Sequence, residues 1–212
     1  MKIPALPALL ATMAFIVGAL TGGTVMAAAP EDHSAPASSR PPGTVAAALP
    51  GDSVYQLDAR FTDQDGRPFS LAQRRGQPML VGMFYTSCEF VCPLLVEALR
   101  NTEAGLTAPE RARLSVLLIT IDPVRDTVAV LKRTAGQREI DSPRWTLARS
   151  DVATTRKLAA ILGLQYRALP NGDFNHSTDL ILLDAEGRVA ARTKQLSGID
   201  PEFLRKVKLS AQ

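Results

Sequence analysis

The chain has 212 residues, with 24 Lys and Arg against 21 Asp and Glu, and its formal net charge is +3 at pH 7. Hydrophobic residues make up 46% of it, an ordinary fraction for a globular protein, so the chain can bury a sizeable core. No basic block with interleaved aromatic residues occurs in the sequence, which argues against nucleic-acid binding.

Residues 1–29 have the pattern of a targeting segment. Lys2 is the only charged residue in it, and an apolar stretch is followed by small residues. A secretory signal cut near Ala27 or Ala28 fits this pattern. A membrane anchor over residues 3–29 fits equally well, because a span needs about 20 mostly apolar residues. Both alternatives place the protein outside the cytoplasm, in the bacterial periplasm, either soluble after cleavage or anchored to the inner membrane.

Residues 30–50 are predicted to be a linker without a core, because they hold five prolines among Ala, Ser and Gly. His33 lies in this linker, and we expect it to be a solvated side chain rather than a ligand. The folded domain is predicted over residues 51–212. It opens with a hairpin of two short strands around the turn at Asp65 and Gly66.

Three mainly apolar runs are predicted to form buried strands of a central sheet, because each is bounded by turn residues. These runs are Met79–Tyr85, Leu114–Ile121 and Leu180–Leu183. Two further strands are predicted at Trp145–Ala148 and, after a tight turn, at Val189–Thr193.

Segments that begin at capping residues and carry an apolar stripe are predicted to form helices between these strands. The first helix starts within Phe90–Pro93 and ends near Gly105, and the second runs from the cap Asp126–Thr127 to the stop Gly136. The third runs from the cap Ser150–Asp151 to Gly163, and the last runs from Pro201 through Val207. This order predicts an α/β, thioredoxin-like fold: a central mixed sheet flanked by helices, with an extra N-terminal hairpin.

Cys88 and Cys92 are the only cysteines of the chain, and they lie where the first buried strand gives way to a helix. Pro93 suits a first helical turn, so both thiols are expected near a helix N-terminus, which favours the thiolate. Four-residue spacing places both side chains on one side. The pair can therefore act as a dithiol, a disulfide or two soft metal ligands, whereas a loop this short gives a structural disulfide little value.

His176 is the candidate third ligand. It lies in Pro170–Ser177, a segment rich in turn residues that is predicted to be a loop directly before the third buried strand. A histidine there can reach the end of a neighbouring strand and complete a Cu(I) site with the two thiolates. The alternative is a surface or capping histidine of no special role.

Three ordered segments resemble the Sco/SenC family of copper chaperones. Tyr85–Pro93 resembles the Cys-x-x-x-Cys-Pro segment of the family, and Thr120–Thr127 resembles its Asp-Pro-x-Arg-Asp-Thr segment. Asp173–Ser177, followed by a strand and by Asp184–Gly187, resembles its distal histidine region. The resemblance covers Val54 to Val207.

The resemblance implies copper, as Cu(I) or Cu(II), bound by Cys88, Cys92 and His176. It also implies a role in assembling the copper centre of cytochrome c oxidase, either by delivering metal to the copper-receiving subunit or by reducing the cysteines of that subunit. Another periplasmic copper or thiol protein is the alternative partner. The family commonly has Pro and an acidic residue after the first cysteine, where this chain has Glu89 and Phe90, so the surface that meets the partner is altered.

Two enzymatic alternatives use the same thiols. Cys88 and Cys92 would be the catalytic pair of a thiol–disulfide oxidoreductase, although common exchange enzymes carry Cys-x-x-Cys, with one residue fewer. A thiol peroxidase is a weaker alternative: Thr86 lies two residues before Cys88, but the Pro and Thr spacing of such enzymes is not reproduced.

Four other residues have predicted roles. Asp126 is expected to be a helix cap, while Asp122 is either a group that orients the site or part of a turn at the strand end. Phe84 and Trp145 are expected to belong to the core.

Overall fold

The computed structural model describes residues 48–140 and 144–212, which belong to one compact unit, Ala46–Gln212. The predicted signal or anchor segment 1–29 lies outside the described residues, as does nearly all of the predicted linker with His33, so these assignments stay predictions. Among the described helices, none has the length and apolar character needed to cross a membrane.

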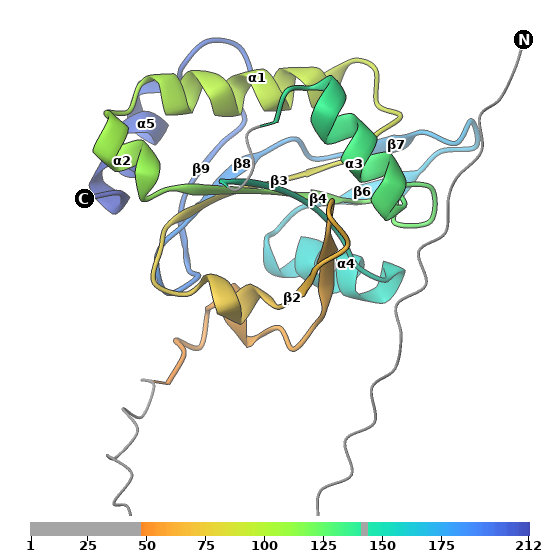
Figure 1. Ribbon diagram of the computed structural model, residues 1–212, viewed down its shortest axis with the longest axis horizontal. Helices are drawn as coiled ribbons and strands as arrows, with labels where there is room; N and C mark the ends of the chain where they lie inside the picture. The colour runs from red at the N-terminus through yellow and green to blue at the C-terminus, as the bar shows by residue number, and fades with distance from the viewer. Residues whose placement is uncertain (1–47, 141–143) are drawn as a thin grey trace, which may run out of the picture. The chain divides into compact units, whose positions relative to one another are not determined.

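In the described part of the chain, seven strands form one mixed sheet in the order β2-β1-β5-β4-β3-β8-β9 (Figure 1). Strands β3, β4 and β5 run parallel, and the remaining pairs are antiparallel. The three predicted apolar runs are the adjacent strands β4, β3 and β8, and they are buried because helices cover both faces of the sheet. The strands are β1 Phe61–Asp63, β2 Pro68–Phe69, β3 Met79–Phe84, β4 Ser115–Thr120, β5 Trp145–Arg149, β8 Leu180–Leu183 and β9 Val189–Thr193.

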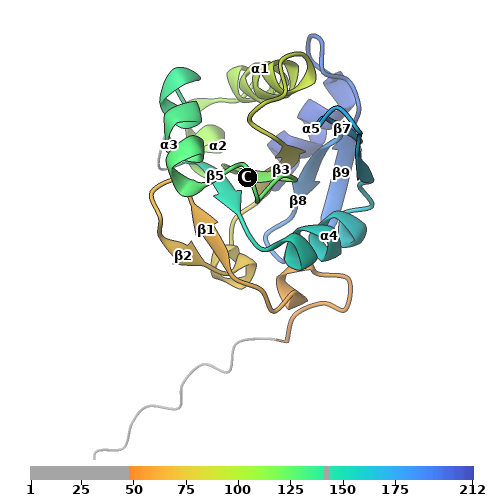
Figure 2. The ribbon, with the colours of Figure 1, turned by 90° about the vertical axis from the view of Figure 1, so that its right-hand side faces the viewer.

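Helices α1 and α3 lie over one face of the sheet and α4 lies over the other (Figures 1 and 2). Helix α5 packs near the C-terminal end of α1, where Leu204 lies against Gly105. The predicted fold class is confirmed: a thioredoxin-like α/β domain with a central mixed sheet and an extra N-terminal hairpin, β1–β2. The helices are α1 Val91–Ala104, α2 Ala108–Ala112, α3 Val128–Gln137, α4 Val152–Ile161 and α5 Pro201–Ser210, with 3-10 turns at Val54–Gln56 and Leu71–Arg74.

Of the two predicted ends of helix α3, the stop is wrong and the cap is confirmed in part. Gly136 does not stop the helix, which continues through Gln137, because this glycine does not take the left-handed conformation that ends helices. Of the predicted cap Asp126–Thr127, Thr127 is confirmed and Asp126 does not cap the helix. Thr127 is the N-cap, and its side chain accepts a hydrogen bond from the backbone N–H of Val130 at 3.3 Å.

The segment around His176 is a β-hairpin and not the predicted loop. Strand β6, Tyr166–Ala168, pairs antiparallel with β7, Phe174–His176, so that Tyr166 lies opposite His176. These two strands form a separate sheet outside the seven-stranded one. Sequence patterns miss the strands because they have only three residues each and are largely exposed.

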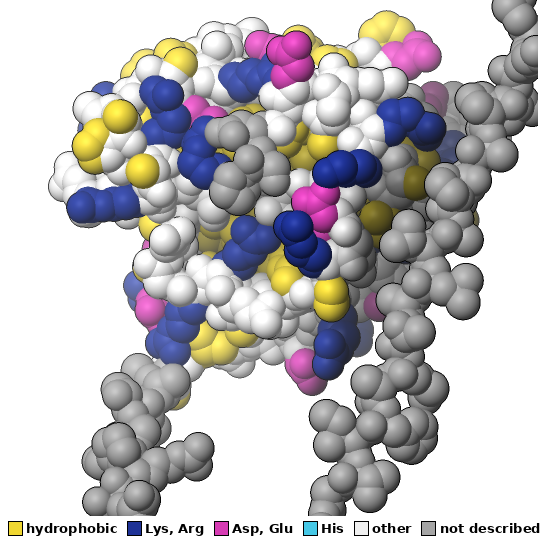
Figure 3. Space-filling model, in the orientation of Figure 1, with side chains coloured by type: hydrophobic (Ala, Val, Ile, Leu, Met, Phe, Trp, Pro, Cys, Tyr) yellow, Lys and Arg dark blue, Asp and Glu magenta, His cyan; other side chains and the backbone are white. Residues whose placement is uncertain are grey.

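The face of the molecule in Figure 3 carries Lys and Arg side chains in separate groups, with acidic and apolar side chains between them. Among the described residues, several basic side chains pair with acidic ones, for example Lys132 with Asp65 and Arg125 with Asp122. Such pairs lower the positive charge that the surface presents to solvent.

Candidate metal centre

The end of strand β3 and the start of helix α1 hold the two cysteines as the sequence predicts. The N–H of Cys88 donates to the Tyr85 carbonyl at 3.2 Å, which closes a turn before the helix begins at Val91. The N–H of Cys92 donates to Cys88 Sγ at 3.3 Å. Since helix α1 has no side-chain cap at its N-cap residue, this sulfur is an acceptor for an N–H group of the first helical turn.

The three predicted ligands come together in space. One ligand atom each from Cys88, Cys92 and His176 lies within 4.8 Å of the other two, and no other such cluster of three or more occurs in residues 48–140 and 144–212. His176 Nδ1 lies 2.8 Å from the Ser177 carbonyl oxygen, which can only accept, so Nδ1 carries the proton. This bond leaves the Nε2 lone pair available for a metal.

The two thiols differ in exposure and in acidity. Burial raises the pKa of Cys88, but hydrogen bonds from Cys92 and from the backbone of Val91 and Phe90 outweigh it, so its pKa lies below the ordinary value. Burial, together with the nearby Cys88, raises the pKa of Cys92 far above that value. Burial lowers the pKa of His176, which keeps the imidazole neutral at pH 7 and able to bind a metal.

We expect iodoacetamide to modify Cys88 at least about ten times faster than Cys92 at pH 7, because the thiolate is the nucleophile and Cys92 is only 2% exposed. As the pH is raised, the modification rate of Cys88 should reach its plateau before about pH 8.5, the ordinary thiol pKa, whereas the rate of Cys92 should still be rising at that pH. Mass spectrometry of labelled peptides measures both rates. Equal rates, or faster labelling of Cys92, would contradict the assignment.

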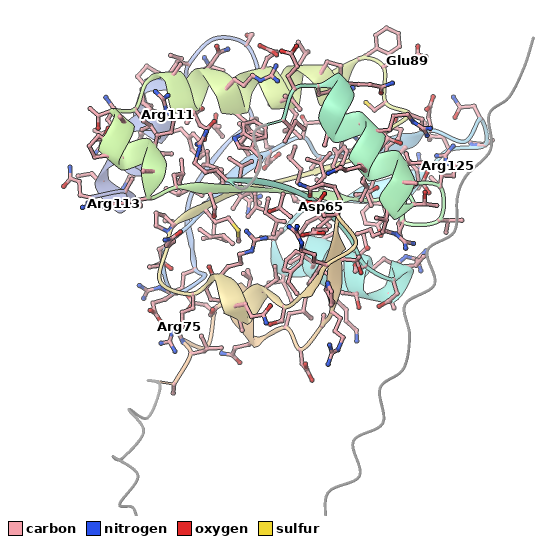
Figure 4. The ribbon with its side chains drawn as sticks, in the orientation of Figure 1. Asp65, Arg75, Glu89, Arg111, Arg113 and Arg125 are labelled. Atoms are coloured by element: carbon pink, nitrogen blue, oxygen red, sulfur yellow. The ribbon has the colours of Figure 1, made fainter. Side chains whose placement is uncertain are left out.

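A cleft of about 440 Å³ opens over this cluster. Cys88 and His176 line the cleft, and Cys92 is not among its lining residues. The residues that depart from the family pattern, Glu89 and Phe90, also line the cleft, and Phe90 is 81% exposed. Figure 4 marks this end of the molecule with Glu89 and Arg125. A partner that reaches the cluster through the cleft therefore meets Cys88 and His176 before Cys92.

Asp126, expected to be a helix cap, instead holds the loop that carries Cys88. Its carboxylate accepts hydrogen bonds from the Thr86 N–H at 3.1 Å, from the Thr86 hydroxyl and from the Thr120 hydroxyl. Asp126 is 1% exposed, so these hydrogen bonds lie inside the protein. Sequence spacing could have suggested this role only weakly, because Asp126 and Thr86 are 40 residues apart.

Asp122, whose role the sequence left open, pairs with Arg125 and is 6% exposed. Phe84 and Trp145 are buried in the hydrophobic core, as predicted. Tyr85 packs edge-on against the His176 ring, with 5.7 Å between ring centroids. Burial raises the pKa of Tyr85 to about 12, so its phenol stays protonated beside the cluster.

Three comparisons relate the chain to known proteins. The SCO1/SenC family model matches residues 50–210. A Stutzerimonas stutzeri protein described as a candidate copper-binding protein is 29% identical over 139 residues, which cover 64% of this chain and 66% of that protein. Across the curated relatives, the match spans from 34% to 66% of their own length.

Two solved structures have the same fold. Bradyrhizobium japonicum ScoI with copper bound superposes with a TM-score of 0.61 and 22% identity, covering 72% of this chain and 96% of that one. BsSco is described as having a disulfide switch and as a member of the Sco family of cytochrome c oxidase assembly proteins. It superposes with a TM-score of 0.62 and 20% identity, covering 72% and 91%.

Proposed function

The chain belongs to the SCO1/SenC family, and we propose that it is a copper-binding chaperone that helps to assemble the copper centre of cytochrome c oxidase. The observation that carries this proposal is the cluster of two thiols and one imidazole, whose ligand atoms lie within 4.8 Å of one another. The copper-bound ScoI structure and the Stutzerimonas relative support copper as the metal.

The donor set of the cluster fits copper. Thiolate sulfur selects Cu(I), and imidazole nitrogen suits both copper oxidation states. Copper is here the cargo of the protein, held by Cys88, Cys92 and His176 until another protein takes it. Because Cys88 and His176 line the cleft and Cys92 does not, incoming ligands of a recipient that enter the cleft would meet Cys88 and His176 first.

The recipient in this proposal is the copper-receiving subunit of cytochrome c oxidase, or another periplasmic copper or thiol protein. The description of BsSco as an oxidase assembly protein supports the first of these. The location we propose is the periplasm, with residues 1–29 acting either as a cleaved signal or as an anchor in the inner membrane. The apolar composition of that segment supports both.

Replacing His176 by alanine is expected to weaken copper binding by about ten- to a hundred-fold, because it removes one of three ligands and leaves a two-thiolate site. Competition between the reduced protein and a strong Cu(I) chelator measures this change. Copper binding that is weak in the wild type and indifferent to His176 would overturn the proposal.

A second candidate, thiol–disulfide exchange, is favoured by the unequal thiols. The Cys88 thiolate would attack a partner disulfide, and Cys92 would then displace the partner from Cys88, leaving an intramolecular disulfide here and two thiols on the partner. This activity needs no imidazole ligand. His176→Ala should therefore leave exchange with oxidised glutathione unchanged while it weakens copper binding, which separates the two functions.

A further inference from the structure

The hairpin that carries His176 stands apart from the strands that carry the cysteines. In the described residues, β6 and β7 pair with each other and with no strand of the main sheet. The base of the hairpin is closed by the Ser177 N–H, which donates to the Gln165 carbonyl at 2.8 Å. Because no ladder of backbone hydrogen bonds fixes this hairpin against β3 in the described residues, its position over the cysteines depends on side chains and on its short links to α4 and β8.

One side chain, Arg125, binds the hairpin to the loop that follows strand β4. Its Nε donates to the Asp122 carboxylate, and its Nη2 donates to the carbonyl of Gly172 in the hairpin turn. Its guanidinium carbon also lies 5.7 Å from the centroid of the Phe174 ring. Arg125 therefore contacts both the turn of the hairpin and one of its two strands.

From Phe174 the contacts continue to the histidine. The Phe174 ring packs edge-on against Tyr85, with 5.1 Å between centroids, and Tyr85 in turn packs against His176. Tyr85 is only 5% exposed and lies three residues before Cys88. The ring stack thus fixes the imidazole relative to the cysteine loop, provided that Phe174 stays in place.

The turn itself is shaped for this contact. Gly172 has a φ of +87°, which strongly favours glycine, and a Cβ atom there would lie 3.3 Å from Arg125 Nη1. The glycine backbone therefore approaches the guanidinium closely enough to present its carbonyl group. Asp122, the other partner of Arg125, is held in place: it is 6% exposed, and its N–H donates to the Thr120 hydroxyl at 2.9 Å.

We propose that Arg125 is a positioning residue for His176: it docks the β6–β7 hairpin against the loop after β4 and so holds the imidazole over the two thiols. The expected effect of Arg125 on copper affinity rests on the proposed function, whereas its effect on the position of the hairpin does not. Lysine cannot replace it, since a single ammonium group lacks the planar fork that bonds Asp122 and Gly172 while it stacks on Phe174.

The first test is amide hydrogen exchange of the metal-free protein. Arg125→Lys should speed exchange in residues 165–177 and leave exchange in β3 and β4 unchanged, because a local contact is lost. The matched control is Arg188→Lys, because the side chains of Arg188 and Arg125 are 49% and 48% exposed and each pairs with an aspartate. Arg188 lies in the turn between β8 and β9, where it bonds Asp184 at 2.9 Å. Equal hairpin exchange in the two variants would overturn the proposal.

The second test is a double-mutant cycle on copper affinity. Arg125→Lys and Arg125→Ala should each weaken Cu(I) binding by about ten-fold in the wild type, the usual effect of losing a group that orients a ligand. In the His176→Ala background they should change it by less than about two-fold, because the residue they position is gone. Equal losses in both backgrounds would mean that Arg125 acts on general stability and would overturn the inference.

The outcomes of the two proposals are distinguishable. If His176→Ala alone leaves copper affinity unchanged, the ligand set of the proposed function fails, and the exchange experiment still decides whether Arg125 docks the hairpin. If His176→Ala weakens binding but the Arg125 variants behave like Arg188→Lys, the ligand set stands and the positioning role is overturned.

Discussion

Copper affinity is expected to fall by about a hundred- to a thousand-fold when Cys92 is replaced by serine. Structural zinc sites with four ligands are worth roughly 10–16 kcal/mol, so one ligand of such a site contributes about 2.5–4 kcal/mol, and we expect a similar loss here. Serine has nearly the shape of cysteine but offers a hard, protonated hydroxyl that is a poor ligand for Cu(I). Cys92 is 2% exposed, so no solvent ligand can easily take its place.

Chelator competition on the reduced protein measures this loss, and Cys88→Ser should cause one of similar size. The control is Ser87→Ala, a change in the same loop at an exposed position that supplies no ligand. Unfolding curves of the metal-free variants check that the fold is intact. If Cys92→Ser kept the wild-type copper affinity, the buried thiol would not be a ligand, and only Cys88 and His176 would remain of the assigned ligand set.

Replacing Asp126 by alanine is expected to lower the free energy of unfolding by about 3 kcal/mol, because three donors lose their charged acceptor inside the protein. For a domain of this size the loss corresponds to a fall in Tm of about 6–12 °C. Thermal denaturation followed by circular dichroism measures it. Copper affinity should fall as well, since Thr86 lies two residues before Cys88 and loses two of its hydrogen bonds.

The matched control is Asp151→Ala, which removes the cap of helix α4. The Asp151 carboxylate accepts from the Thr154 N–H at 2.8 Å at an exposed site, so its loss should cost only about 1 kcal/mol. If both variants had the same Tm, Asp126 would contribute no more to stability than an ordinary helix cap, the role that the sequence predicts.

The order of strands and helices could be predicted from the sequence because the central strands carry long apolar runs. Those runs in β3, β4 and β8 are buried on both faces, and such segments have a clear sequence signature. The start of helix α1 was equally clear, since Pro93 restricts where a helix can begin. Cys88 and Cys92 could be paired from their spacing alone. His176 was a candidate third ligand from its place before the third buried strand, and the resemblance to the family favoured it over a surface histidine.

What the sequence could not show depends on contacts between distant segments. Asp126 resembles a helix cap in the sequence, and only its burial against Thr86 shows that it supports the cysteine loop. The β6–β7 hairpin is short and polar, so no periodicity marks it. The contact of Arg125 with Gly172 joins residues 47 positions apart, and one-dimensional patterns carry no information about such a pair.

X-ray absorption spectroscopy of the copper-loaded protein tests most directly whether Cys88, Cys92 and His176 form a single copper centre. We expect one copper per chain with two sulfur scatterers and one imidazole nitrogen, and we expect the imidazole signal to disappear in His176→Ala. A first shell of oxygen and nitrogen alone, or a wild-type spectrum that persists in His176→Ala, would contradict this assignment.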